Sequence, residues 1–259
     1  MQPPRLAVLT VLATLSVASV AQVARAVDAF EIQVYDGTAN DPGQAGLELH
    51  LNRVAKGLRE SESPELPPHH QTHATFEPSF GITKNWELGG YFQTALLADG
   101  ALAYAGAKLR SKLVTSPDFH PHVRLGINVE LAKIPRIFER DRWGAELRPI
   151  AAFEDDDWLF AFNPIFAIAL AGKDAGAPGF EPALAAYKKV RGVVSFGFEY
   201  YGSIGKPYNP SPRSEQLHYL YGVGNLIAFD AWELNVGVGG GLTAASNGLV
   251  LKAIVGHVF

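Results

Sequence analysis

The side chains that could carry out catalysis are few and widely spaced along this chain of 259 residues. Ser195 and His218 form the one serine–histidine pair on neighbouring predicted strands, and a nucleophilic serine needs a base within hydrogen-bond reach. We expect both side chains on the interior side of their strands, whereas an enzyme that attacks membrane lipid would need them on the outer side. No motif surrounds either residue. The sequence therefore predicts no enzyme and no catalytic residues.

A second chemical possibility is a metal site around His69, His70 and His73, with Glu77 nearby. On the strand predicted for this segment, His69 and His73 share a side and His70 does not, a spacing that matches no defined metal site. The simpler interpretation is a polar rim, with His73 inside and hydrogen-bonded to Glu77 or Glu48. The chain has no cysteine, which excludes thiolate sites and disulfides. We therefore predict no metal and no other cofactor.

Charged side chains recur at every second residue of segments whose alternate positions are apolar. This alternation is typical of strands with one polar and one apolar face. Acidic and basic sets fall on neighbouring strands, and we expect them to neutralise one another because unpaired charge in a confined interior is costly. A polar path for a solute is a second role, compatible with the first. The candidates for lining the interior are Glu48, His50, His73, Glu77, Glu87, Lys108, Arg110, Lys112, Arg124, Glu130, Glu146, Arg148 and Lys252.

These residues must be positioned by strands, because no helical periodicity of comparable length is present. We predict about twelve strands, with limits of ten to fourteen, near residues 45–54, 70–82, 86–95, 101–114, 121–132, 143–153, 157–170, 180–189, 191–202, 215–226, 231–242 and 248–259. Longer polar connections mostly follow the odd-numbered strands, and tight turns mostly follow the even-numbered ones. Bacterial outer-membrane barrels combine an even strand number, short periplasmic turns and long external loops. The predicted fold is an all-β transmembrane antiparallel β-barrel over residues 45–259, with both termini in the periplasm.

The N-terminus carries an export signal. One positive charge in Met1–Arg5 precedes the apolar run Leu6–Val20, and Ala24-Arg25-Ala26 supplies the small residues of a cleavage site. This pattern predicts a signal peptide over residues 1–26, since the apolar run is short for a membrane-spanning helix. Residues 27–44 follow, with a short strand expected at Glu31–Asp36 and a turn at Asn40–Gly43. This segment lies in the periplasm or folds back as a plug, and the sequence does not distinguish between these two placements.

Aromatic residues mark the strand ends. Trp86, Trp143, Trp158 and Trp232 each open a predicted strand, as expected for amphipathic rings at a membrane–water boundary. The last strand alternates up to Phe259 and resembles the C-terminal signal that the outer-membrane assembly machinery reads. We therefore predict that the protein lies in the outer membrane of a Gram-negative bacterium.

Several short segments carry a family resemblance. They are Glu31–Asp36 (EIQVYD), Gly46–His50 (GLELH), Phe80–Thr83 (FGIT), Asn85–Gly89 (NWELG), Trp232–Asn235 (WELN), Gly239–Thr243 and Leu249–Phe259. With them the chain resembles a group of bacterial outer-membrane barrels related to the phenol meta-pathway, transporter-like family, over most of its length. The resemblance implies passage or binding of hydrophobic or aromatic compounds, and it implies no catalytic residues.

Three functions remain open at this stage. The first is transport or passive diffusion of small molecules. The second is a non-conducting structural or surface-interaction barrel. The third, which the residues favour least, is an outer-membrane lipid hydrolase. The expected partners are outer-membrane lipid and lipopolysaccharide, the barrel-assembly machinery and a small-molecule solute. The net charge of −4 gives no electrostatic basis for binding nucleic acid.

Overall fold

The computed structural model describes residues 28–172, 175–226 and 231–259, so the signal peptide predicted over residues 1–26 lies outside the described residues. Among the residues that it describes, no helix has the length and apolar character needed to cross a membrane. These residues form fourteen β-strands, of which β10 and β11 have only two residues each.

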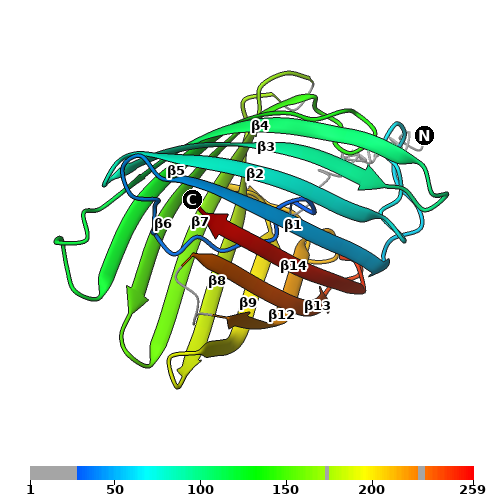
Figure 1. Cartoon of the computed structure of the whole chain (residues 1–259). Coiled ribbons are helices and arrows are strands. Elements are labelled where there is room, and N and C mark those ends of the chain that lie inside the picture. Colours follow the sequence, from blue (N-terminus) through cyan, green and yellow to red (C-terminus); the bar gives the residue numbers. More distant parts are fainter. Residues whose placement is uncertain (1–27, 173–174, 227–230) are drawn as a thin grey trace, which may run out of the picture.

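The twelve longer strands close into one antiparallel barrel (Figure 1), because β1 pairs with β14 and β8 pairs with β9. The barrel strands are β1 (Ala45–Lys56), β2 (Thr72–Thr83), β3 (Trp86–Leu96), β4 (Leu102–Val114), β5 (Val123–Lys133), β6 (Trp143–Glu154), β7 (Trp158–Ala169), β8 (Pro178–Val190), β9 (Val194–Ser203), β12 (Leu217–Leu226), β13 (Trp232–Gly241) and β14 (Leu249–Val258). The predicted fold and strand number are confirmed.

The long connection after β9 contains structure that the sequence did not predict. Here β10 (Gly205–Lys206) and β11 (Asn209–Pro210) form a small hairpin, and Gly205 pairs with Phe180 near the start of β8. Elsewhere each strand end lies within three residues of its predicted place. Period-two alternation is a local signal, and it ends where the side chains of a strand no longer face two different surroundings.

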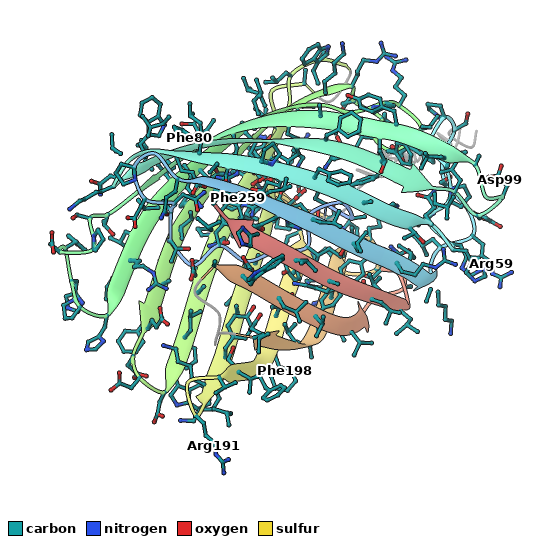
Figure 2. The ribbon with its side chains drawn as sticks, in the orientation of Figure 1. Arg59, Phe80, Asp99, Arg191, Phe198 and Phe259 are labelled. Carbon is teal, nitrogen blue, oxygen red and sulfur yellow. The ribbon has the colours of Figure 1, made fainter. Side chains whose placement is uncertain are left out.

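Burial along the strands is inverted with respect to a soluble protein. On β2, Phe76 is 45% exposed and the adjacent Glu77 is 2% exposed. Figure 2 shows Phe80 and Phe198 projecting from the outer surface, where lipid would surround them. The four tryptophans are the first residues of β3, β6, β7 and β13, as predicted. Apolar positions outward and polar positions inward are the arrangement that a hydrocarbon environment requires.

One part of the wall is weakly paired. The ladder between β6 and β7 is interrupted between the Leu147–Phe166 and Ala151–Phe162 pairs, and Pro149 and Pro164 lie within the interruption. Pro164 is also opposite Pro182 of β8. Since proline has no backbone N–H, this row of the wall lacks donors that the other strands use.

Residues 28–44, called here the N-terminal segment, run inside the barrel. Phe30, Ile32, Val34 and Tyr35 of this segment are each less than 10% exposed. The strand expected at Glu31–Asp36 does not form. A closed barrel offers no free strand edge with which this segment could pair, so its backbone groups are satisfied by side chains of the wall instead.

The segment turns back before β1. Gln44 donates its backbone N–H to the carbonyl of Asp41 at 3.0 Å, which closes a turn next to the predicted Asn40–Gly43. Gly43 lies in this turn with φ = 86°, a conformation that favours glycine. The turn lets the chain leave the interior and enter the wall at Ala45.

Candidate functional site

The interior has two chemically different sides. The charged wall comprises the inward faces of β1 to β6 and carries every candidate interior residue except Lys252 of β14. The apolar wall comprises the inward faces of β7, β8, β9 and β12, with Ala161, Ile165, Ala183, Ala185, Tyr201, Tyr219, Tyr221 and Val223. The N-terminal segment lies between the two walls.

The bases of β4 meet the acids of β2 and β3. Arg110 places its Nε 2.7 Å from Glu77 and one terminal nitrogen 2.6 Å from Glu87. Lys112 lies 2.9 Å from the same Glu87 carboxylate. Arg110 is 4% exposed and both carboxylates are buried. Here opposite charges of neighbouring strands neutralise one another within the charged wall.

Lys108 connects the charged wall to the N-terminal segment. Its ammonium group lies 3.2 Å from Glu130 on β5 and 3.4 Å from Glu31, and it also donates a hydrogen bond to Asp28. Burial acts to raise the pKa of Asp28, but the charge and hydrogen bond of Lys108 outweigh it and hold that pKa below its ordinary value. Asp28 and Glu31 therefore act as anionic partners that the wall itself does not supply.

Arg148 of β6 makes the second charged connection. Its guanidinium lies 3.2 Å from Glu31 and 2.7 Å from Glu146, and it is 2% exposed. The same guanidinium sits 4.4 Å from the ring centre of Tyr35, within range of a cation–π contact. A single buried arginine therefore holds two points of the N-terminal segment.

Tyr35 is bonded to the wall through both its side chain and its backbone. Its hydroxyl lies 2.5 Å from that of Tyr91 on β3. Its backbone N–H donates to Asn163 at 2.7 Å, and its carbonyl accepts a hydrogen bond from the same amide at 2.9 Å. Asn163 lies next to Pro164, so the segment is fastened from inside at the row where the wall ladder is interrupted.

The C-terminal part of the segment, beyond Tyr35, is also bound by side chains of the charged wall. Arg124 donates to the carbonyl of Asp36 at 2.8 Å and also pairs with Glu154 at 2.5 Å. The backbone N–H of Asn40 donates to Glu87 at 2.7 Å. The contacts thus extend along the segment and are not confined to one residue.

The hydrogen-bond partners of His73 differ from those predicted. His73 does not bond Glu77 or Glu48. Its ring nitrogens lie 3.1 Å from the carbonyl of Ala29 and 2.9 Å from Gln71, and its ring stacks on Phe30 with centres 4.2 Å apart. The reason is that the N-terminal segment occupies the space in front of His73, which strand periodicity could not reveal.

His50 takes the contacts expected of His73. Its Nε2 lies 3.0 Å from Glu77 and 3.3 Å from Glu48, so these three residues bring ligand-type atoms within 4.8 Å of one another. Glu77 is already bound by Arg110, and Glu48 accepts a hydrogen bond from Gln33 at 3.1 Å. A divalent cation would have to compete with these donors, so we assign no metal to the group.

Lys252 faces the apolar wall and forms an ion pair there. It lies 2.6 Å from Glu199 of β9, and the hydroxyls of Tyr187 and Tyr201 donate to the same carboxylate. The sequence predicted Lys252 in the interior but not the two tyrosines, because interior positions were selected from charged side chains.

The placement of His218 was predicted wrongly. On β12 the buried positions are Leu217, Tyr219 and Tyr221, so His218 faces outward and bonds the hydroxyl of Tyr200 at 2.6 Å. The prediction took the polar set of each strand as interior, and on the apolar wall that rule selects the wrong face. Ser195 does face inward, but its register partner is Asn225, seven residues along β12 from His218. No serine–histidine pair is formed by these two residues.

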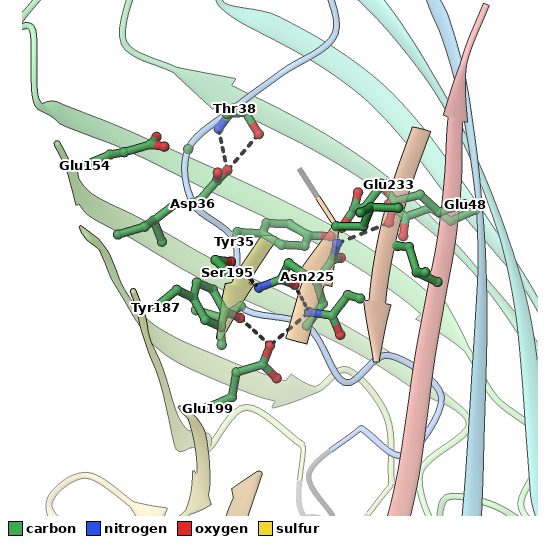
Figure 3. A pocket seen from close by; sticks show the side chains of 18 of the residues that line it. Tyr35, Asp36, Thr38, Glu48, Glu154, Tyr187, Ser195, Glu199, Asn225 and Glu233 are labelled. Atoms are coloured by element: carbon green, nitrogen blue, oxygen red, sulfur yellow. Dashed lines mark hydrogen bonds between the residues drawn. The ribbon is translucent and has the colours of Figure 1, made fainter. Parts of the chain in front are cut away.

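Open space remains beside the N-terminal segment. A cavity of about 270 Å³ (Figure 3) is lined by Tyr35, Asp36 and Thr38 of the segment and by Tyr187 and Glu199 of the apolar wall, among others. A second cavity of about 260 Å³ also contacts Thr38. Both lie towards the short turns that join β2 to β3, β6 to β7 and β8 to β9, the short-turn end of the barrel.

The middle of the interior is much more tightly filled. The cavity described between Glu31, Arg148 and Tyr201 has only about 20 Å³. Cavities therefore lie towards the short turns, whereas the N-terminal segment and the charges that hold it leave little space around Glu31, Arg148 and Tyr201.

Comparison with known proteins supports the fold. No protein-family model and no curated protein matches the chain. An outer-membrane channel from Pseudomonas putida F1 is similar in structure, with a TM-score of 0.61 and 13% identity over 88% of this chain and 100% of that one. The KdgM porin gives a TM-score of 0.55 and 10% identity over 83% of this chain and 99% of that one. The fold is therefore that of the outer-membrane channel and porin barrels.

Proposed function

We propose that the protein is an outer-membrane channel through which small molecules diffuse passively, and that the N-terminal segment is its plug. The observation that carries this proposal is that the middle of the interior is filled by a segment that is not part of the barrel wall. That segment is held by side-chain contacts such as those of Lys108, Arg148 and Asn163. Such contacts can be released one at a time without opening the barrel, because they involve no hydrogen bond of the strand ladder.

The same proposal includes the orientation. We place the short turns and both termini in the periplasm, and the long connections outside, as is general in bacterial barrels. Lipid and lipopolysaccharide would surround the apolar outer surface. Phe259 is 73% exposed and its backbone N–H donates to Ala45 at 2.8 Å, so its ring is free for the assembly machinery while its backbone closes the barrel.

The solute that fits best is small and has an apolar or aromatic side. Ile32 and Val34 of the plug belong to one buried hydrophobic cluster with Ile165 and Tyr201 of the apolar wall. If the plug moves, a solute would find that apolar surface on one side and the charges of the other wall opposite. A purely hydrophilic solute would make no favourable contacts with the apolar side of this path.

The test is single-channel conductance of the refolded chain in a planar bilayer, beside a variant that lacks residues 28–44. We expect small or absent steps for the intact chain and larger, discrete steps for the variant. A heat-dependent gel shift checks that both chains have folded as barrels. In the open variant, Lys112→Gln should shift the ion selectivity towards cations, since it removes one positive charge from the path.

Absence of steps in a folded variant without the plug would refute the channel. The protein would then be a non-conducting barrel with a structural or surface-binding role. To test the solute class, uptake of a small aromatic compound into liposomes containing the variant is compared with uptake of a sugar of similar size. Faster entry of the sugar would contradict the proposed apolar side of the path.

A further inference from the structure

The outer surface carries a groove over β6, β7, β8 and β9. It has a volume of about 530 Å³ and its lining is almost wholly apolar. It is separate from the interior cavities, since its outward side chains include Phe160, Phe162 and Phe198. Phe198 is 63% exposed and projects from the lower part of the barrel in Figure 2.

The groove arises from the order of large and small residues along one row of the wall. Phe160 is opposite Ala186 in the register of β7 and β8, and Ala186 is opposite Phe198 in the register of β8 and β9. The next residue in this row is Gly222 of β12. An alanine between two phenylalanines leaves a hollow with a flat floor and aromatic sides, which suits an extended hydrocarbon chain.

Basic side chains lie at one end of this hollow. Lys188 is two residues beyond Ala186 on the same strand and therefore on the same face, towards the short-turn end. Its ammonium lies 5.0 Å from the ring centre of Trp158 and 3.0 Å from the exposed Asp157. Arg191 follows in the β8–β9 turn, at the tip of the molecule in Figure 2.

This order matches the chemistry of a lipid. Trp158 places Lys188 at the height of the membrane–water boundary, and the groove continues from there into the hydrocarbon region. A phosphate at Lys188 and Arg191 would continue into an acyl chain that lies over Ala186. In the orientation proposed above, this end lies in the periplasmic leaflet, where the lipids are phospholipids.

We propose that the groove binds one anionic phospholipid, with its phosphate on Lys188 and Arg191 and one acyl chain between Phe160 and Phe198. Within a membrane the hydrophobic effect does not distinguish the groove from bulk lipid, so selectivity comes from packing in the hollow and from the two charges. The site does not depend on whether the interior conducts.

The test is native mass spectrometry of the full chain in detergent, titrated with phosphatidylglycerol and, separately, with phosphatidylcholine. We expect one phosphatidylglycerol to be retained more strongly than any further lipid. Ala186→Phe fills the hollow and should weaken retention of both lipids. Lys188→Gln combined with Arg191→Gln should weaken phosphatidylglycerol by about fivefold or more and leave phosphatidylcholine nearly unchanged.

The chain offers matched controls. Lys133 lies 5.1 Å from the ring centre of Trp143, a similar arrangement at the opposite end of the barrel, and neither residue lines the groove, so Lys133→Gln should have no effect. Ala253→Phe adds the same ring to the outer surface of β14. Unchanged lipid retention in Ala186→Phe, or an equal loss in the controls, would overturn the proposal.

Discussion

The charged wall and the apolar wall hold the same segment in different ways. On the charged wall, Lys108 and Arg148 bind carboxylates of the N-terminal segment through directional contacts between buried groups. On the apolar wall, Ile32 and Val34 belong to a buried hydrophobic cluster, and the directional bonds come from the uncharged amide of Asn163 on β7. The difference teaches that the first wall holds the segment through buried charges, whereas the second holds it through an uncharged amide and apolar packing. Removing one partner should therefore cost far more on the charged side.

The largest effect is expected for Arg148→Gln. This change leaves Glu31 and Glu146 buried beside one positive charge fewer, and breaking a buried ion pair costs about 3–5 kcal/mol. The free energy of unfolding, measured by urea titration of the protein in lipid vesicles, should fall by about this amount. The double variant Arg148→Gln with Glu31→Gln should lose less, because it also removes one of the two carboxylates that Arg148 neutralises. Equal losses in the two variants would mean that the pair does not couple.

A smaller effect is expected for Asn163→Leu, which removes the amide that bonds both backbone groups of Tyr35. Each buried group left without a partner costs about 1–3 kcal/mol. Because the change is confined to a side chain and leaves the backbone ladder of β7 in place, the heat-dependent gel shift should stay as in the original chain while hydrogen exchange at the Tyr35 amide becomes faster. Unaltered exchange would show that Asn163 does not fasten the segment.

The smallest effect is expected for the apolar packing. Ile32→Val removes one methylene group from the hydrophobic cluster that also contains Ile165, which costs about 0.5–1.5 kcal/mol. Urea titration measures this loss on the same scale as the Arg148 variant. A loss as large as that of Arg148→Gln would remove the contrast between the two walls.

Much of the fold could be predicted from the sequence because the signals are local. Alternation along one strand, a tryptophan at its start and a short turn such as Thr83–Asn85 each depend on neighbours in the chain. These signals gave the strand number and nearly all strand ends. On the charged wall they also selected residues such as Glu77 and Arg110, which the structure brings together.

The rest depended on the closed barrel. His218 faces outward because the inward residues of β12 are Leu217, Tyr219, Tyr221 and Val223, and its orientation follows from which strands surround it. Likewise, Asp28 meets Lys108 across eighty residues of sequence. Alternation indicates which face of a strand is polar, but it does not indicate which residues lie opposite that face in the barrel. The sequence by itself therefore determined the wall, whereas only the tertiary structure decided what the wall encloses. The physical reason is that contacts across the interior arise only once β1 has paired with β14 and left the N-terminal segment no free edge.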